Sequence, residues 1–156
     1  MNKETQSIIR NLQNVLNSEP WYGRAVYKIL EEITSEIVHK KPNDKSHSLI
    51  ELLYHMITWA EFTLMQIKGA GKEEIEKIES RDWISIDPSA HTWQKGLIEL
   101  KSIHEKIIEL LQPKEDEWLK EKVNFREFNY RFLLNGLIQH NIYHIGQIAY
   151  LKKQLD

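Results

Sequence analysis

Apolar residues recur three or four positions apart through almost the whole chain, and this helical period constrains the fold more than any other feature. The residues that break helices are few, four prolines and six glycines, and most of them stand between the periodic segments. No segment alternates apolar and polar residues in the way that a half-buried strand does. The sequence therefore predicts an all-α protein.

Start and stop signals divide this pattern into helices, which we expect at about residues 3–16, 24–32, 49–68, 87–111 and 126–155. Four of them are long, which favours a four-helix bundle with a short extra helix near the N-terminus. The sharpest start signal is the capping box Ser48-Leu49-Ile50-Glu51. Asp87 and Pro88 supply an N-cap and a first-turn residue for the fourth helix. The last helix is apolar on nearly every side, so we expect it at the centre of the bundle or at a subunit interface.

The segment from residue 71 to residue 87 is long for a connection within a helical bundle. Either it is a long crossover connection between helices that are not adjacent, or it forms one wall of a site. No linker interrupts the sequence, so we expect residues 1–156 to form a single domain.

Composition excludes several classes of function. The formal net charge is -2, which counts against nucleic acid or an acidic membrane as the main partner. There is no cysteine, so disulfides, thiolate metal sites and a protein thiol nucleophile are excluded. The first ten residues hold no apolar signal-peptide core, and no run of about 18 apolar residues occurs. We therefore expect a cytoplasmic protein.

Histidine is the residue type that points to chemistry. His140 and His144 are four residues apart, which places both imidazoles on one face of the last helix. His55 lies in the apolar stripe of another helix, so a facing arrangement can bring it to the same point. Three neutral imidazoles with one open position are a typical catalytic metal site. Nitrogen ligands suit Zn²⁺, Ni²⁺ or Fe²⁺, and affinity alone does not choose among them.

The alternative is that these histidines are ordinary core residues, because two histidines four apart on a helix also occur by chance. Burying several unpaired imidazoles is costly, however, and one metal ion satisfies all of them together. A peptidase of the H-E-x-x-H type is disfavoured, since Asn141 stands where the general-base Glu is required.

Four other residues are candidates for the site. Glu51 is a candidate general base, although the capping box already explains it. Gln147 shares the face of the histidine pair and is a candidate donor to a bound water or substrate. His104 lies on an inward stripe, either as a fourth ligand or as a buried histidine bonded to a neighbour. His47 is a loop residue with a local hydrogen bond, or it lines the pocket.

Three segments of the chain resemble the DinB/YfiT-like superfamily of metal-dependent enzymes. They are Trp21-Tyr22-Gly23, the segment from His47 through His55 to Trp59, and residues 137–148, of which the last is the most specific. From about residue 69 to residue 124 only the helical pattern is similar. The resemblance implies His55, His140 and His144 as metal ligands, a bundle with a long crossover, and a homodimer.

The resemblance also implies a small-molecule substrate and two possible chemistries. One is hydrolysis by a metal-activated water, and the other is transfer of a low-molecular-weight thiol such as bacillithiol or glutathione. The divalent ion expected is Zn²⁺ or Ni²⁺, with Fe²⁺ or Mn²⁺ as alternatives. A thiol cosubstrate requires a second recognition area with cationic or hydrogen-bonding groups beside the metal. The alternatives from other classes are a non-catalytic metal- or ligand-binding stress-response protein and a helical scaffold.

Overall fold

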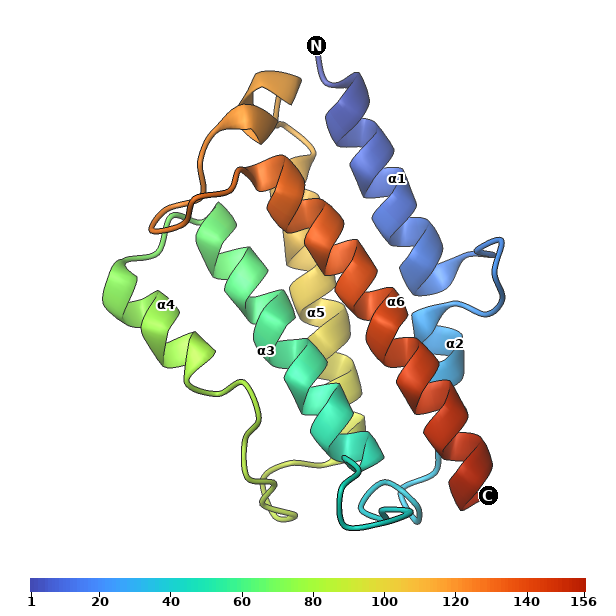
Figure 1. Cartoon of the computed structure of the whole chain (residues 1–156). Coiled ribbons are helices and arrows are strands. Elements are labelled where there is room, and N and C mark those ends of the chain that lie inside the picture. The colour runs from blue at the N-terminus through green and yellow to red at the C-terminus, as the bar shows by residue number, and fades with distance from the viewer.

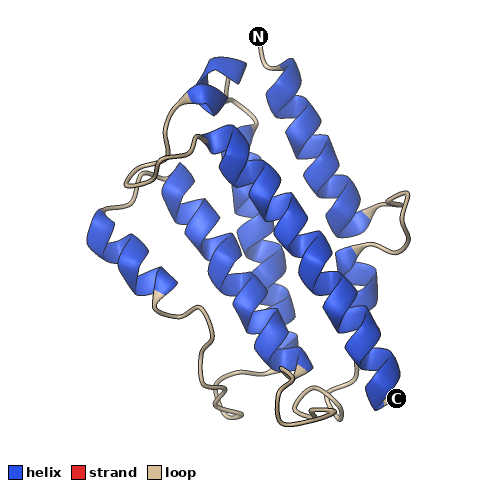
Figure 2. Ribbon diagram, viewed as in Figure 1, coloured by secondary structure: helices blue, strands red, loops and turns tan.

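A computed structural model describes all residues from 1 to 156, and it contains six α-helices, one 3₁₀ helix and no strand (Figure 2). The prediction of an all-α protein is confirmed. No helix has both the length and the apolar character that a membrane span requires. The elements are α1 (Lys3–Asn17), α2 (Val26–Glu31), α3 (Leu49–Ile67), α4 (Lys72–Glu79), α5 (Trp93–Leu111), η1 (Asp116–Lys120) and α6 (Tyr130–Leu155).

The four longest helices, α1, α3, α5 and α6, lie side by side (Figure 1). Helix α3 packs against both α5 and α6, and α6 also packs against α1. The short helix α2 contacts α1 and α6, while α4 lies on the outer side of α3. Fully buried apolar side chains fill the space between the helices, among them Leu53, Met56, Leu100, Ile107 and Ile148.

Helix α3 begins where the sequence predicts. The hydroxyl of Ser48 accepts a hydrogen bond from the Glu51 amide at 3.3 Å, and the Glu51 carboxylate accepts one from the Ser48 amide at 2.6 Å. The capping box is therefore confirmed. It fixes the first turn of the helix that carries His55.

Helix α5 begins six residues later than expected, at Trp93 instead of residue 87. Its N-cap is Thr92, whose hydroxyl accepts from the Lys95 amide at 3.2 Å. The carboxylate of Asp87 instead accepts from the amide and the hydroxyl of Ser89, at 2.9 and 2.7 Å. An aspartate followed by a proline is common in turns as well as at helix N-caps, and here the two residues are part of a turn. The first side chain of this region to be buried is that of Trp93.

Helix α6 begins at Tyr130 instead of residue 126, with Asn129 as the N-cap that accepts from the Phe132 amide at 3.0 Å. The expectation that this helix lies at the centre of the bundle is wrong, whereas a place at a subunit interface stays a prediction. Phe132, Tyr143 and Tyr150 are 64%, 64% and 68% exposed, so one side of α6 forms surface. These aromatic residues read as apolar in the sequence, yet the side of the helix that bears them has no neighbouring element.

The segment between α3 and α5 contains α4, which the sequence analysis missed. Only two of its eight residues, Ile75 and Ile78, are buried, so its apolar period is too short to be recognised. Helices α3 and α5 run in the same direction, and the segment returns along the whole length of α3 (Figure 1). The segment is thus a long connection between two parallel helices, but these helices contact each other, so the alternative in which they are not adjacent is wrong.

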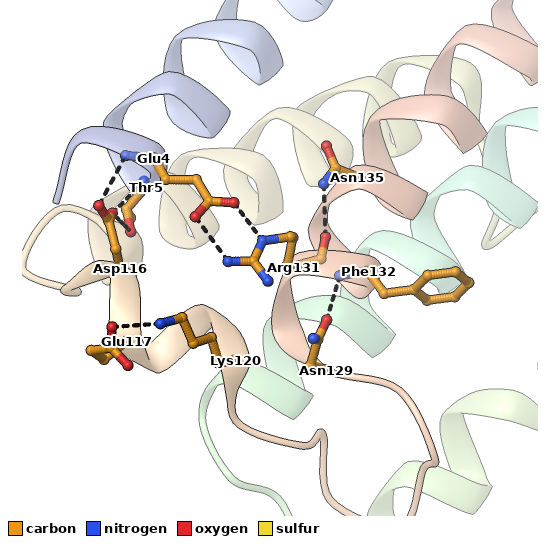
Figure 3. Close-up of polar contacts among 9 residues, drawn as sticks. All are labelled: Glu4, Thr5, Asp116, Glu117, Lys120, Asn129, Arg131, Phe132 and Asn135. Carbon is orange, nitrogen blue, oxygen red and sulfur yellow. Dashed lines mark hydrogen bonds and ion pairs between the residues drawn. The ribbon is translucent and has the colours of Figure 1, made fainter.

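The N-terminal helix is held by contacts from distant parts of the chain (Figure 3). The Asp116 carboxylate accepts from the amides of Glu4 and Thr5 at 3.2 and 2.9 Å, and so caps the first turn of α1 from η1. The Glu4 carboxylate pairs with the Arg131 guanidinium through two N–H groups, one of them at 2.9 Å. These contacts join α1, η1 and the start of α6.

Candidate metal centre

Three imidazoles converge between α3 and α6. The Nε2 atom of His140 lies 3.2 Å from Nε2 of His55 and 3.0 Å from Nε2 of His144. All three ligand atoms lie within 4.8 Å of one another. Two nitrogens bound to one Zn²⁺ at about 2.0–2.1 Å in a tetrahedral site lie about 3.3 Å apart. The spacing of the three residues that the sequence singled out therefore suits a single ion.

The His55 imidazole is oriented by the segment between α3 and α5. Its Nδ1 atom lies 3.0 Å from the Asp82 backbone carbonyl oxygen and 3.0 Å from the Asp82 carboxylate. The Trp59 indole N–H donates to the same carboxylate at 2.6 Å. Because these oxygens only accept, Nδ1 of His55 carries the proton and Nε2 presents a lone pair. A carboxylate or carbonyl behind a histidine is the usual support for a metal ligand.

Gln147 supports His144 in the same way. The Oε1 atom of Gln147 lies 2.6 Å from Nδ1 of His144, so that nitrogen donates and Nε2 is left as the acceptor. Two lone pairs thus face Nε2 of His140. A proton on Nε2 of His140 can be donated to only one of these two lone pairs. A metal cation, by contrast, can accept a lone pair from each of the three nitrogens. The donor set therefore fits a divalent ion.

Burial keeps two of the imidazoles neutral. It lowers the pKa of His140 to about 3, and the neighbouring His144 and His55 add to this shift. Burial also lowers the pKa of His144, although the hydrogen bond that His144 donates to Gln147 opposes the change. Only a neutral imidazole can ligate a metal, so these environments favour binding near neutral pH. The Nδ1 atom of His140 is buried without a hydrogen-bond partner.

Trp83 covers one side of the histidine cluster. Its indole ring is stacked on the His55 ring, with the centroids 3.9 Å apart and the planes at 6°. On its other face it is stacked on His47 at 3.7 Å and 2°. His47 is therefore separated from the cluster by an indole, and it is not one of the converging ligands. The segment between α3 and α5 therefore forms one wall of the site, which is one of the two alternatives that the sequence left open.

His104 lies apart from the cluster in a buried network of its own. Its Nδ1 atom is 2.9 Å from the Tyr27 hydroxyl, and its Nε2 atom is 3.2 Å from the Asn141 side-chain nitrogen. The residue is 1% exposed, and burial lowers its pKa to about 3. Both ring nitrogens are engaged, so His104 is a buried histidine bonded to its neighbours.

Glu51 is occupied by contacts outside the cluster. One carboxylate oxygen accepts from Lys41 Nζ at 3.0 Å, and the other accepts from the Ser48 amide. Burial alone raises the pKa of Glu51, but the Ser48 amide and Lys41 together lower it below the usual value. The structure thus gives Glu51 an ionised, structural environment, while a catalytic role for Glu51 or Gln147 stays a prediction.

Two cavities lie along the groove between α3 and α6, which run in opposite directions (Figure 1), and His140 lines one of them. One, of about 270 Å³, is largely apolar and includes Trp59 and His140 in its lining, and we call it the apolar cavity. The other, of about 340 Å³, is lined by Lys45, His47 and Gln147, among other residues, and we call it the polar cavity. Along α3, the residue that lines the polar cavity precedes His55 and the residues that line the apolar cavity follow it. The histidine cluster therefore lies between the two cavities.

Asp82 and Trp83 are the residues that sequence reasoning missed. They stand in a segment without helical period, and nothing local indicates that an aspartate there contacts a histidine 27 positions earlier. The only available signal was their place in a long connection, because binding and catalytic residues are often found on loops.

Comparison with known proteins supports the same grouping. Residues 23–148 match the family model of the DinB superfamily, and this range includes all three histidines. No curated protein matches the chain.

Proposed function

Because the chain belongs to the DinB superfamily, we propose that it is a metal-dependent enzyme whose divalent ion is held by His55, His140 and His144. The single observation that carries this proposal is the convergence of three Nε2 atoms, two of which are fixed as acceptors by Asp82 and Gln147. In this proposal α1, α3, α5 and α6 form a four-helix bundle that works as a homodimer.

A divalent ion at this point would supply a Lewis acid that lowers the pKa of a thiol or a water at its open position. The residues of the chain have separate tasks. Asp82 and Gln147 keep protons on the outer nitrogens of His55 and His144, and so present both lone pairs to the ion. Trp83 covers the His55 ring and keeps water from that face. We propose these as positioning residues.

The chemistry we favour is transfer of a low-molecular-weight thiol to a small electrophile. The thiol sulfur forms a bond to carbon, the bond from that carbon to the leaving group breaks, and the leaving group departs with the electron pair. The thiol proton passes to solvent, and no oxidant is needed. The chain has no cysteine, so the sulfur must come from a cosubstrate.

The polar cavity supports this choice over hydrolysis. A small thiol cosubstrate carries charged and hydrogen-bonding groups, which require partners beside the ion. In this cavity Lys45 supplies a cation, and Ser46, His47, Gln147 and Gln154 supply hydrogen-bonding groups. Hydrolysis of a small molecule requires no such second area. A non-catalytic ligand-binding protein is disfavoured as well, because the cluster is flanked by two cavities.

Elemental analysis of protein purified without added metal is the first test. We expect close to one divalent ion per chain in the wild type and a sharp loss in His140→Ala. The matched control is His39→Ala, which removes an exposed histidine away from the site. Full metal content in His140→Ala would show that this ligand is wrongly assigned.

The second test follows thiol consumption with glutathione or bacillithiol and an alkylating electrophile. We expect metal-dependent conjugation that is lost in His140→Ala and kept in His39→Ala. Equal rates in metal-loaded and chelated protein would contradict the proposal. Metal-dependent cleavage of an ester with no thiol present would favour the hydrolase instead.

A further inference from the structure

The apolar cavity beside His140 has a lining that selects the chemistry of its occupant. It lies in the groove between α3 and α6, one helical turn beyond the histidine cluster on both helices. The residues that define its apolar surface are Trp59, Phe62, Phe128, Phe132, Leu133 and Leu137. Four of these six are aromatic, and His140 stands at the end that adjoins the cluster.

Apart from the buried Nδ1 atom of His140, which has no hydrogen-bond partner, the polar side-chain groups in this lining already have partners within the protein. The Thr63 hydroxyl donates to the Trp59 carbonyl at 2.9 Å, and the Trp59 indole N–H donates to Asp82. The only two charged residues, Glu79 and Arg126, form an ion pair with each other. A charged ligand would therefore lose its hydration here without gaining a free partner of opposite charge, which is costly.

Arg126 is engaged on more than one side. Its guanidinium lies over the Phe62 ring, 5.3 Å from the centroid, and its Nη1 donates to the Phe125 carbonyl at 2.8 Å. Glu79 is its third partner, so the guanidinium is not free to bind an anionic ligand. Within the lining it neutralises Glu79.

The size of the cavity suits a small organic molecule. An engineered apolar cavity of about 150 Å³ in another protein stays dry and binds benzene. At about 270 Å³ this cavity has room for one substituted ring. Aromatic walls favour such a ligand through offset-stacked and edge-to-face contacts.

We propose that this cavity binds the uncharged, aromatic or similarly compact apolar body of the electrophilic substrate. The inference rests on the proposed thiol transfer and adds the substrate class. The polar cavity takes the thiol and the apolar cavity takes the acceptor, on opposite sides of the histidine cluster. The reacting carbon lies at the His140 end, where the bond to sulfur forms and the leaving group departs with its electron pair.

Gly136 offers a way to fill the cavity without disturbing the rest of the fold. It lies on α6 and lines the cavity, and a Cβ atom built there meets nothing within 4 Å. Gly146 is a matched control on the same helix, since it also has open space around a Cβ atom but does not line this cavity. The variants are Gly136→Leu and Gly146→Leu.

The binding experiment uses three probes of one shape and different charge: benzyl alcohol, benzoate and benzylamine. Titrations followed by protein NMR are made with chelated and with metal-loaded protein. We expect benzyl alcohol to bind the wild type and Gly146→Leu, and to bind Gly136→Leu more weakly by about tenfold or more. Benzoate or benzylamine binding as tightly as the alcohol, or unchanged binding to Gly136→Leu, would overturn the inference.

The kinetic experiment compares 1-chloro-2,4-dinitrobenzene with iodoacetamide as acceptors for glutathione. We expect Gly136→Leu to raise KM for the aromatic acceptor by about tenfold or more and to leave iodoacetamide unaffected. Equal losses with both acceptors would overturn the inference. Probe binding does not depend on the metal, so absence of conjugation together with intact probe binding would refute the proposed thiol transfer alone.

Discussion

The indole of Trp83 lies flat on the imidazole of His55, with 3.9 Å between the ring centroids. The two residues come from different parts of the fold, since His55 belongs to α3 and Trp83 to the segment that leads from α4 to α5. Trp83 is 41% exposed although both its faces are covered by imidazoles. The contact therefore couples an accessible indole to a candidate metal ligand.

This stacking predicts that Trp83 reports on the ion. Ni²⁺ bound at the cluster should quench the indole fluorescence, because a paramagnetic ion at a stacked ring provides a fast decay route. We expect Trp83→Phe to lose most of the quenching. Trp118→Phe is the control, since Trp118 is stacked on Tyr130 away from the cluster. Quenching of full amplitude in Trp83→Phe would contradict the prediction.

A second prediction concerns Gln147. Its side chain fixes the proton on Nδ1 of His144, so Gln147→Ala should weaken metal binding by about 10- to 100-fold. Gln147→Glu keeps an acceptor and should bind close to the wild-type affinity. Gln139→Ala removes an exposed glutamine from the same helix and serves as the control. Competition with a chromophoric chelator measures all three, and wild-type affinity in Gln147→Ala would refute the role.

A third prediction is that His104 makes stability depend on pH. Its pKa is about 3 in the folded chain and about 6.5 when unfolded, so the unfolded state binds more protons between these values. The free energy of unfolding should therefore fall as the pH decreases from 6.5 toward 3, by about 1.4 kcal/mol per pH unit for this group. Above pH 6.5 the contribution is fully present.

Urea unfolding of chelated protein at several pH values measures this slope. His104→Gln, which can still form hydrogen bonds, should flatten the slope by close to one proton. His39→Gln should leave it unchanged, because His39 is exposed. A slope in His104→Gln as steep as in the wild type would show that His104 is not the group responsible.

A fourth prediction concerns the contact between α3 and α5. A Cβ atom on Gly96 would lie 2.8 Å from Leu53 Cδ2 and 3.0 Å from Tyr54 Cε2. Replacing glycine by alanine inside a helix normally stabilises by about 1 kcal/mol, whereas overpacking a core costs about 1–3 kcal/mol. We expect Gly96→Ala to be destabilised by about 1 kcal/mol and Gly146→Ala, with open space, to be stabilised. Urea unfolding of the two variants checks the opposite signs.

Much of the fold could be read from the sequence because its signals are local. The capping box of α3 and the apolar period of the long helices depend on residues within a few positions of one another. The start of α5 was misjudged where two local signals competed, since Asp87 forms a turn with Ser89 and leaves the cap to Thr92. Helix α4 was missed because only two of its side chains are buried.

The convergence of the histidines was predictable, but their support was not. The pair on α6 follows from spacing, and His55 follows from its apolar stripe. The contact of Asp82 with His55 and the stack of Trp83 depend on the path of a non-helical segment through space, which no periodic pattern encodes. Exposure of Tyr143 and Tyr150 likewise depends on which neighbours α6 lacks.

Since α3 and α5 point the same way, the chain has to travel back along the bundle before α5 can begin. That obligatory return places Asp82 and Trp83 over the imidazoles. Exchanges at Asp82 and Trp83 can thus remodel this wall of the site, whereas exchanges at Ile75 and Ile78, which belong to the core, also change the stability of the fold. One short stretch of the chain therefore carries both residues that shape the site and residues that resist unfolding.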